Sequence, residues 1–161
     1  NRIEDLQWLA PSNDALRKKK VLATENTNSE METERSDEAV DRPLIYVVDD
    51  DPAVAEVIEA LLDLYGHKSK VFTKPKEALD SFITEPIKPK LLITDFQMPK
   101  MNGMELLQAC KRDHPSLRCI SASGTLHVEE MKVYPIQPDK HLAKPFYPRQ
   151  LLDAVEEMVT G

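Results

Sequence analysis

The sequence contains no apolar run that approaches the roughly 20 residues needed to cross a bilayer. Its first residues also lack the basic-then-apolar order of a secretory signal. An excess of positive charge is lacking, since acidic residues outnumber basic ones and the formal net charge is -7, whereas nucleic-acid phosphates are normally met by basic surfaces. We therefore expect a cytoplasmic protein with no membrane contact and no direct nucleic-acid partner.

Cysteine is also scarce, with two residues in 161. Cys110 and Cys119 lie inside apolar patterns at no metal-ligand spacing, which favours buried free thiols in a reducing compartment over a disulfide or a metal site. The hydrophobic content of 41% is enough for one domain with a real core plus an appendage. The chain begins with Asn1 rather than Met, so we expect it to be part of a longer protein.

The first 43 residues differ in composition from the rest. Residues 3–10 and 13–23 have short helical patterns, and the second carries the basic run Arg17–Lys20, which suits a solvated helix face better than a nucleic-acid contact. Residues 24–42 hold almost no large apolar side chains and cannot bury enough surface to offset the entropy of ordering. We predict a partly helical or disordered linker at 1–43 and a domain at 44–161.

From residue 44 onward, short apolar runs of strand type alternate with helical patterns. The predicted strands are residues 44–48, 69–72, 91–94, 117–122 and 141–143. Helices are predicted around residues 52–65, 75–83, 104–113, 128–134 and 149–159. Tyr65 and Ile83 are counted among the inward positions, and Pro135 and Pro138 limit the fourth helix to two turns. This alternation predicts an α/β domain whose parallel sheet is covered on both faces.

The chemically unusual residues follow the strands. Asp49 and Asp50 come after the first strand, Asp95 after the third, Ser123 after the fourth and Lys144 after the fifth. The loops that follow parallel strands converge along one edge of the sheet. Three carboxylates there repel one another unless a hard cation such as Mg²⁺ neutralises them. A lysine and a hydroxyl suit the oxygens of a phosphoryl group, and the acid between metal and lysine can act as a nucleophile.

Each of these residues also has a structural explanation. Asp49–Asp51 could cap the first helix, and Asp51 is the best candidate for that. Asp95 could be a turn residue, Ser123 a strand terminator and Lys144 a surface lysine. We favour a shared site, because separate strand ends would otherwise have to show matching chemistry by accident.

The residues at these strand ends resemble, in order, the motifs of the response-regulator receiver domain of two-component signalling. The matching segments are 47–52, 95–103, 123–124 and 144–146, and the resemblance extends from residue 44 to about 160. It implies a flavodoxin-like, doubly wound, five-stranded parallel sheet of order 2-1-3-4-5.

The resemblance also implies roles for three of these residues. Asp95 would accept a phosphoryl group from a phosphohistidine of a histidine kinase or phosphotransfer protein, in a bacterial two-component or phosphorelay pathway. Ser123 would bond the phosphoryl oxygen, and Lys144 would pair with the phosphate. Such a domain is a signalling phosphoacceptor and not an enzyme, apart from self-catalysed phosphotransfer and autodephosphorylation. Upstream domains of the same polypeptide are further expected partners.

The implied metal ion is Mg²⁺. Its ligands would be Asp49, Asp50, Asp95 and the backbone carbonyl of Gln97, with Asp50 binding directly and Asp49 alongside or through water.

Further positions are implied to tune or switch the domain. Gln97 and Thr125 occupy variable positions that set autodephosphorylation. His141 stands where the family often has an aromatic residue that swings inward on activation, or it is a plain strand-end residue. Ser121 has the same strand parity as Ser123 and is the alternative switch hydroxyl, although Ser123 stands directly before Gly124.

Two departures from the family pattern affect the expected switch surface. Asn102 stands where the family often has Asp. Residues 126–139 hold two prolines where the family has a longer helix, so this region is expected to be remodelled or loosely ordered.

Two rival functions remain. The first is a receiver-like docking or dimerisation scaffold that works without phosphorylation. The second is an aspartate-nucleophile phosphatase, which tends to carry another acid two residues after the nucleophile, where this sequence has Gln97.

Overall fold

A computed structural model of the chain describes residues 42–124 and 127–161. The predicted linker, except its last two residues, and Thr125 lie outside the described residues. Five strands form one parallel sheet in the order β2-β1-β3-β4-β5, which confirms the predicted flavodoxin-like order. The strands are β1 (Leu44–Val48), β2 (Lys68–Phe72), β3 (Leu91–Thr94), β4 (Arg118–Gly124) and β5 (Lys140–Lys144).

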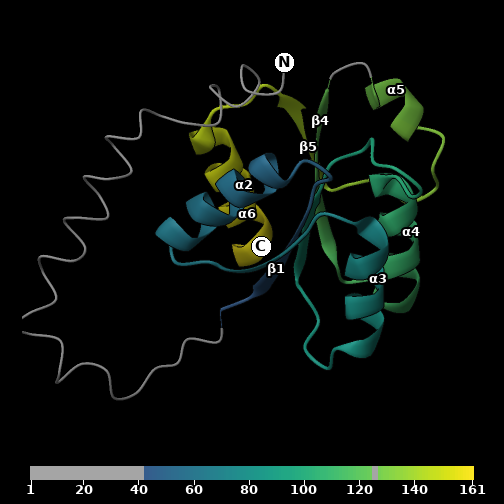
Figure 1. The fold of residues 1–161 in the computed structure, drawn as a ribbon, viewed down its shortest axis with the longest axis horizontal. Coiled ribbons are helices and arrows are strands. Elements are labelled where there is room, and N and C mark those ends of the chain that lie inside the picture. The colour runs from purple at the N-terminus through teal and green to yellow at the C-terminus, as the bar shows by residue number, and fades with distance from the viewer. Residues whose placement is uncertain (1–41, 125–126) are drawn as a thin grey trace, which may run out of the picture.

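Helices cover both faces of the sheet (Figure 1). They are α2 (Pro52–Leu64), α3 (Pro75–Thr84), α4 (Gly103–Asp113), α5 (Val128–Met131) and α6 (Pro148–Thr160). Figure 1 shows α2 and α6 on one side, and α3, α4 and α5 on the other. None of the described helices is long and apolar enough to cross a membrane.

The core forms two layers, one on each face of the sheet. Successive side chains of a strand point to opposite faces. Ile45 and Val47 therefore pack with α2 and α6, whereas Tyr46 and Val48 pack with α3, α4 and α5. Fully burying one such side chain contributes about 1.5–3 kcal/mol, so these layers hold the strand ends in place.

Local sequence signals set the helix starts. Asp51 caps α2, with its side chain accepting a hydrogen bond from the Ala53 N–H at 3.0 Å, as the sequence predicts. Asn102 and Glu105 form a reciprocal capping box at the start of α4. Gly66 follows the end of α2 with φ of 79°, a conformation that favours glycine.

Several predicted details are wrong. Tyr65 and Ile83 are 49% and 58% exposed, so neither faces the core. Tyr65 lies beyond the last helical turn of α2, and Ile83 is rotated by one residue from the buried Phe82. β4 continues to Gly124 instead of ending at residue 122, because its pairing with β5 extends that far.

The segment after β4 was expected to be either remodelled or loosely ordered. Its described part has a shortened helix and makes hydrogen bonds to α4. α5 has only four residues. Gln108 of α4 makes two hydrogen bonds to the backbone of Ile136, at 2.8 and 3.0 Å. Asn102 donates from Nδ2 to the Tyr134 hydroxyl at 2.8 Å. These bonds fix the connection from α5 to β5 against α4.

Candidate functional site

Three carboxylates meet where β1 and β3 end. The two strands are neighbours, with Val48 opposite Thr94, so the residues that follow them lie level with each other. Asp95 continues the ladder by donating its N–H to the Val48 carbonyl at 3.0 Å. One carboxylate oxygen from each of Asp49, Asp50 and Asp95 lies within 4.8 Å of the others. We call these three residues the acid cluster.

Lys144 joins the acid cluster from the end of β5. Its Nζ lies 3.1 Å from Asp49 Oδ2, a hydrogen-bonded ion pair, and 3.8 Å from Asp95 Oδ1. The Asp49 side chain is only 4% exposed and that of Lys144 20%, so this contact is largely shielded from water. The structure thus brings Lys144 and the acids together as the sequence predicts.

The backbone around Asp95 is held tightly by the loop before α4. The Asp95 carboxylate accepts a hydrogen bond from the Phe96 N–H at 2.8 Å, and the Thr94 hydroxyl donates to the Asp95 carbonyl at 2.9 Å. The Gly103 N–H donates to the Phe96 carbonyl at 2.8 Å. A Cβ at residue 103 would lie 2.0 Å from the Asp95 carbonyl oxygen, so only glycine fits there.

Burial opposes the charge of two of the acids. Burial raises the pKa of Asp95 to about 6, with Lys144 acting against the shift and the charges of Asp49 and Asp50 adding to it. Burial likewise raises the pKa of Asp49, and its ion pair with Lys144 opposes this. One lysine therefore does not offset the cost of packing these carboxylates together, and a divalent cation would.

Ser123 is fully buried beside this edge of the sheet. Its Oγ has no hydrogen-bond partner among the described residues. Ser121, the alternative hydroxyl, donates to the Met131 sulfur at 3.3 Å. A buried hydroxyl without a partner costs free energy. Among the described residues, Ser123 is thus the hydroxyl of the pair that lacks a partner.

The sheet order and the acid cluster can be compared with a known protein family. The family model for the response regulator receiver domain matches residues 45–156. The chain belongs to the response-regulator receiver domain family.

Individual relatives of this receiver domain are named as transcriptional or response regulators. NtrC of Klebsiella pneumoniae, a DNA-binding transcriptional regulator, is 31% identical over 106 residues, which are 65% of this chain and 22% of that protein. The DNA-binding response regulator MtrA of Mycolicibacterium smegmatis is 28% identical over 114 residues, which are 71% of this chain and 49% of MtrA. A solved CheY-like receiver domain protein from Methanospirillum hungatei JF-1 superposes with a TM-score of 0.67 at 26% identity, covering 74% of this chain and 94% of that one.

These relatives bear on two further expectations. They favour the receiver function in two-component signalling over the phosphorylation-independent scaffold. The chain spans at most about half of the length of the two curated relatives, whose names describe DNA-binding proteins. The expectation of no nucleic-acid partner therefore finds no support in them.

For three predicted site residues of the receiver domain, no contact among the described residues tests a place at the acid cluster. Gln97 is exposed in the loop after β3, and no described contact places its carbonyl among the acids. His141 is half-buried on β5 opposite Ser121, and burial lowers its pKa. Thr125 lies outside the described residues. The roles of these three residues stay predictions.

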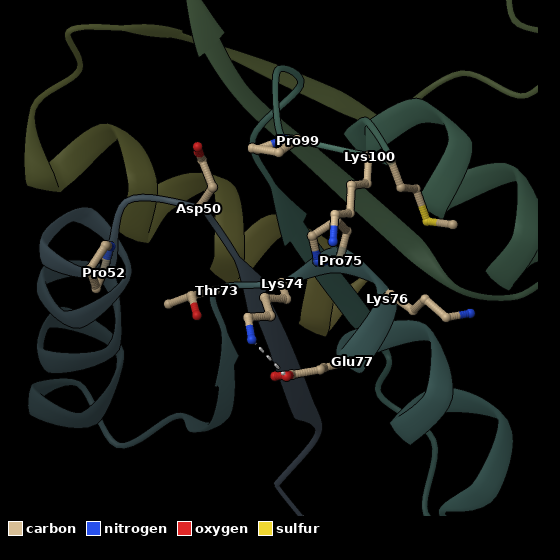
Figure 2. A pocket seen from close by; sticks show the side chains of 10 residues that line it. Asp50, Pro52, Thr73, Lys74, Pro75, Lys76, Glu77, Pro99 and Lys100 are labelled. Atoms are coloured by element: carbon tan, nitrogen blue, oxygen red, sulfur yellow. Dashed lines mark ion pairs between the residues drawn. The ribbon is translucent and has the colours of Figure 1, made fainter.

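Two features escaped the reasoning from sequence. The capping box of Asn102 and Glu105 was readable from the Asn-x-x-Glu spacing. A pocket of about 640 Å³ lies beside the acid cluster, bordered by the loops after β1, β2 and β3 (Figure 2). No single sequence motif signals it, because three separate loops form its wall.

Proposed function

We propose that Asp95 accepts a phosphoryl group from a phosphohistidine in a two-component pathway or phosphorelay. The observation that carries this is the meeting of Asp95 with two other carboxylates within 4.8 Å and with Lys144 Nζ at 3.8 Å. An Asp95 carboxylate oxygen attacks phosphorus and forms an acyl phosphate. The phosphorus–nitrogen bond breaks and its electron pair stays on that nitrogen, and the donor ring leaves as neutral imidazole because its other nitrogen already carries a proton.

In this proposal Mg²⁺ binds at the acid cluster through Asp49, Asp50, Asp95 and the backbone carbonyl of Gln97. The donor set is all oxygen, which Mg²⁺ prefers. The raised pKa of Asp95 fits such a site, since a cation favours the charged carboxylate. When bound, the ion neutralises charge on the transferring phosphoryl group.

Lys144 and Ser123 would hold the phosphoryl oxygens once the acyl phosphate forms. Lys144 then exchanges its contact with Asp49 for one with the phosphate. Ser123, whose hydroxyl has no partner among the described residues, donates to a phosphoryl oxygen and draws the following loop with it. The shift alters the face near α5 and β5, where His141 lies, while Gln97 and Thr125 set how long the acyl phosphate lasts.

The wider setting belongs to the same proposal. The donor is a histidine kinase or a phosphotransfer protein, and upstream domains connect through residues 1–43 to a domain that begins near Leu44. The domain catalyses only its own phosphorylation and dephosphorylation. The buried free thiols of Cys110 and Cys119 are compatible with the reducing cytoplasm. The net charge of -7 disfavours nucleic-acid contact by this part of the protein.

Labelling with acetyl phosphate tests the proposal. With Mg²⁺, we expect one phosphoryl group on the 161-residue chain, removable by hydroxylamine as an acyl phosphate is. The group should be absent from Asp95→Asn and after EDTA. The matched control is Asp51→Asn, because asparagine caps a helix as well as aspartate does and Asp51 lies outside the acid cluster. Equal labelling of Asp95→Asn would overturn the assignment.

A further inference from the structure

The pocket beside the acid cluster has the size of a small-molecule site. Its volume is about 640 Å³, within the range of roughly 300–1,000 Å³ that is typical of ligand pockets. It is bordered by the start of α2, the first turn of α3 and the loop between β3 and α4 (Figure 2). The residues that line it are Asp50, Pro52, Thr73, Lys74, Pro75, Lys76, Glu77, Pro99, Lys100 and Met101.

Much of the wall of this pocket is apolar and stiff. Pro52 and Pro75 open α2 and α3, Pro99 lies in the loop between β3 and α4, and Met101 adds a thioether. The proline rings fix their own backbone angles, so these walls need little ordering when a ligand enters. Burying apolar surface against them is favourable. The wall therefore suits an apolar body such as an aromatic ring or a short hydrocarbon chain.

Charges of both signs line the pocket, since Asp50 and Glu77 are acidic and three lysines are basic. Lys74 is paired with Glu77 at 3.6 Å, whereas no carboxylate lies within ion-pair distance of Lys100 among residues 42–124 and 127–161. Figure 2 shows the Lys100 side chain extending toward Pro75, across the pocket, and the Lys76 side chain pointing away from it. Lys100 also adopts φ of 70°, which is unusual for a residue other than glycine. Its ammonium group thus faces the pocket without a carboxylate partner in the part of the chain that the structure describes.

We propose that this pocket binds a small amphipathic anion, an apolar body that carries one carboxylate. The body would pack against the prolines and Met101, and the carboxylate would pair with Lys100. A neutral ligand of the same shape would remove water from the ammonium group without replacing its hydrogen bonds, which is costly. The carboxylate would lie at the Lys100 end, away from the like charge of Asp50.

Three probes separate the two parts of the ligand. 4-Phenylbutyrate has both an apolar body and a carboxylate, 4-phenylbutanol has the body alone, and acetate has the carboxylate alone. Each is titrated into the ¹⁵N-labelled 161-residue chain while backbone amide shifts are followed. We expect saturable shifts at Lys76, Glu77, Lys100 and Met101 with phenylbutyrate. Phenylbutanol should bind about tenfold more weakly, since a charge-assisted hydrogen bond is missing.

Two lysine variants locate the charge. Lys100→Gln should weaken phenylbutyrate binding about tenfold and should not weaken the binding of phenylbutanol. Lys76→Gln is the matched control, because Lys76 lines the same pocket but points away from it, and its binding should stay within about twofold of wild type. Ligand-free spectra that overlay away from the substituted residue show that both variants fold.

Three results would each overturn the inference. They are the absence of saturable shifts around the pocket, equal affinity for phenylbutyrate and phenylbutanol, and an unchanged phenylbutyrate affinity in Lys100→Gln. Phosphorylation enters none of these measurements, so failure of the proposed phosphoacceptor function leaves the outcome unaffected.

Discussion

Asp95 is held between a lysine that favours its charge and a buried setting that opposes it. Burial has the larger effect, since the pKa of Asp95 rises to about 6. In the unfolded chain the pKa is about 3.9. Between these values the folded state binds more protons than the unfolded state, so the free energy of unfolding falls as pH rises from about 4 to about 6. Above about pH 6, the folded protein bears the full free-energy cost of the ionised Asp95 carboxylate.

Asp95→Asn should therefore stabilise the metal-free protein at pH 7. The asparagine cannot ionise, so the variant avoids a cost on the order of 2 kcal/mol. Urea unfolding of both proteins in EDTA at pH 4 and pH 7 measures this. The advantage should be largest at pH 7 and mostly lost at pH 4. Equal stability at pH 7, or a difference that does not shrink at pH 4, would show that Asp95 is not buried in the way described.

Ser121 and Ser123 point to a second prediction at this scale. Ser121 donates to the Met131 sulfur, whereas Ser123 Oγ has no partner among the described residues. Ser123→Ala should leave the free energy of unfolding unchanged or raise it by up to about 1 kcal/mol, because an unpaired buried hydroxyl is removed. Ser121→Ala should lower it by about 0.5–1 kcal/mol, because a hydrogen bond is lost.

The same two variants identify the switch hydroxyl. Beryllofluoride with Mg²⁺ mimics the phosphoryl group on an aspartate and should shift backbone amides around β4 and α5 in the wild type. Ser123→Ala should lose most of that response, and Ser121→Ala should keep it. The reverse pattern would assign the switch to Ser121.

At the scale of elements, the short α5 is followed by a segment that is hydrogen-bonded to side chains of α4. Four residues of helix bury little surface, and side chains of α4 replace that packing with hydrogen bonds. Gln108 bonds both the N–H and the carbonyl of Ile136, as a neighbouring strand would. Lys111 adds a 3.8 Å ion pair to Asp139, which accepts a hydrogen bond from the Cys119 N–H. The connection into β5 is thus set by α4.

Gln108→Ala should release that connection. Loss of two hydrogen bonds should lower the free energy of unfolding by about 1–2 kcal/mol. Hydrogen exchange at the Ile136 amide should become faster than the drop in the free energy of unfolding predicts. Exchange at the amides of β1 should change only by the amount that this drop predicts. Gln108→Glu is the matched control, since it keeps the acceptor for the Ile136 N–H and should show a smaller effect. Equal exchange in all three proteins would contradict the role given to Gln108.

At the scale of the molecule, general rules for parallel sheets account for what could be predicted. Strand ends converge at one edge, so Asp49, Asp95 and Lys144 had to be neighbours once the alternation of strands and helices was read correctly. The exposure of Ile83 could not be predicted, because it depends on where α3 ends relative to its neighbours. The missing partner of Ser123 was also out of reach, since a hydroxyl finds its bonds only in three dimensions.

The pocket, too, could not be predicted from the sequence. Pro52, Pro75 and Pro99 are spread over 48 residues of sequence, and each reads as an ordinary helix-start or loop proline. Only the sheet order β2-β1-β3 brings their loops side by side.

Mg²⁺ should stabilise the whole molecule through the acid cluster. A ligand that binds only the folded state raises the free energy of unfolding by about 1.4 kcal/mol for each tenfold rise in concentration above its Kd. We expect this dependence in urea unfolding at pH 7. It should weaken below pH 6, because Asp95, with a pKa of about 6, then takes up a proton and ceases to attract the ion.

Two adjacent acids provide the matched pair for this measurement. Asp50 belongs to the acid cluster, whereas Asp51 caps α2 and lies outside it. Asp50→Asn should flatten the dependence on Mg²⁺, and Asp51→Asn should keep the wild-type slope, because asparagine serves equally as a cap. Both variants remove one negative charge from the same turn, so a general screening effect would change them alike. Identical slopes in the two variants would therefore place the ion somewhere other than the acid cluster.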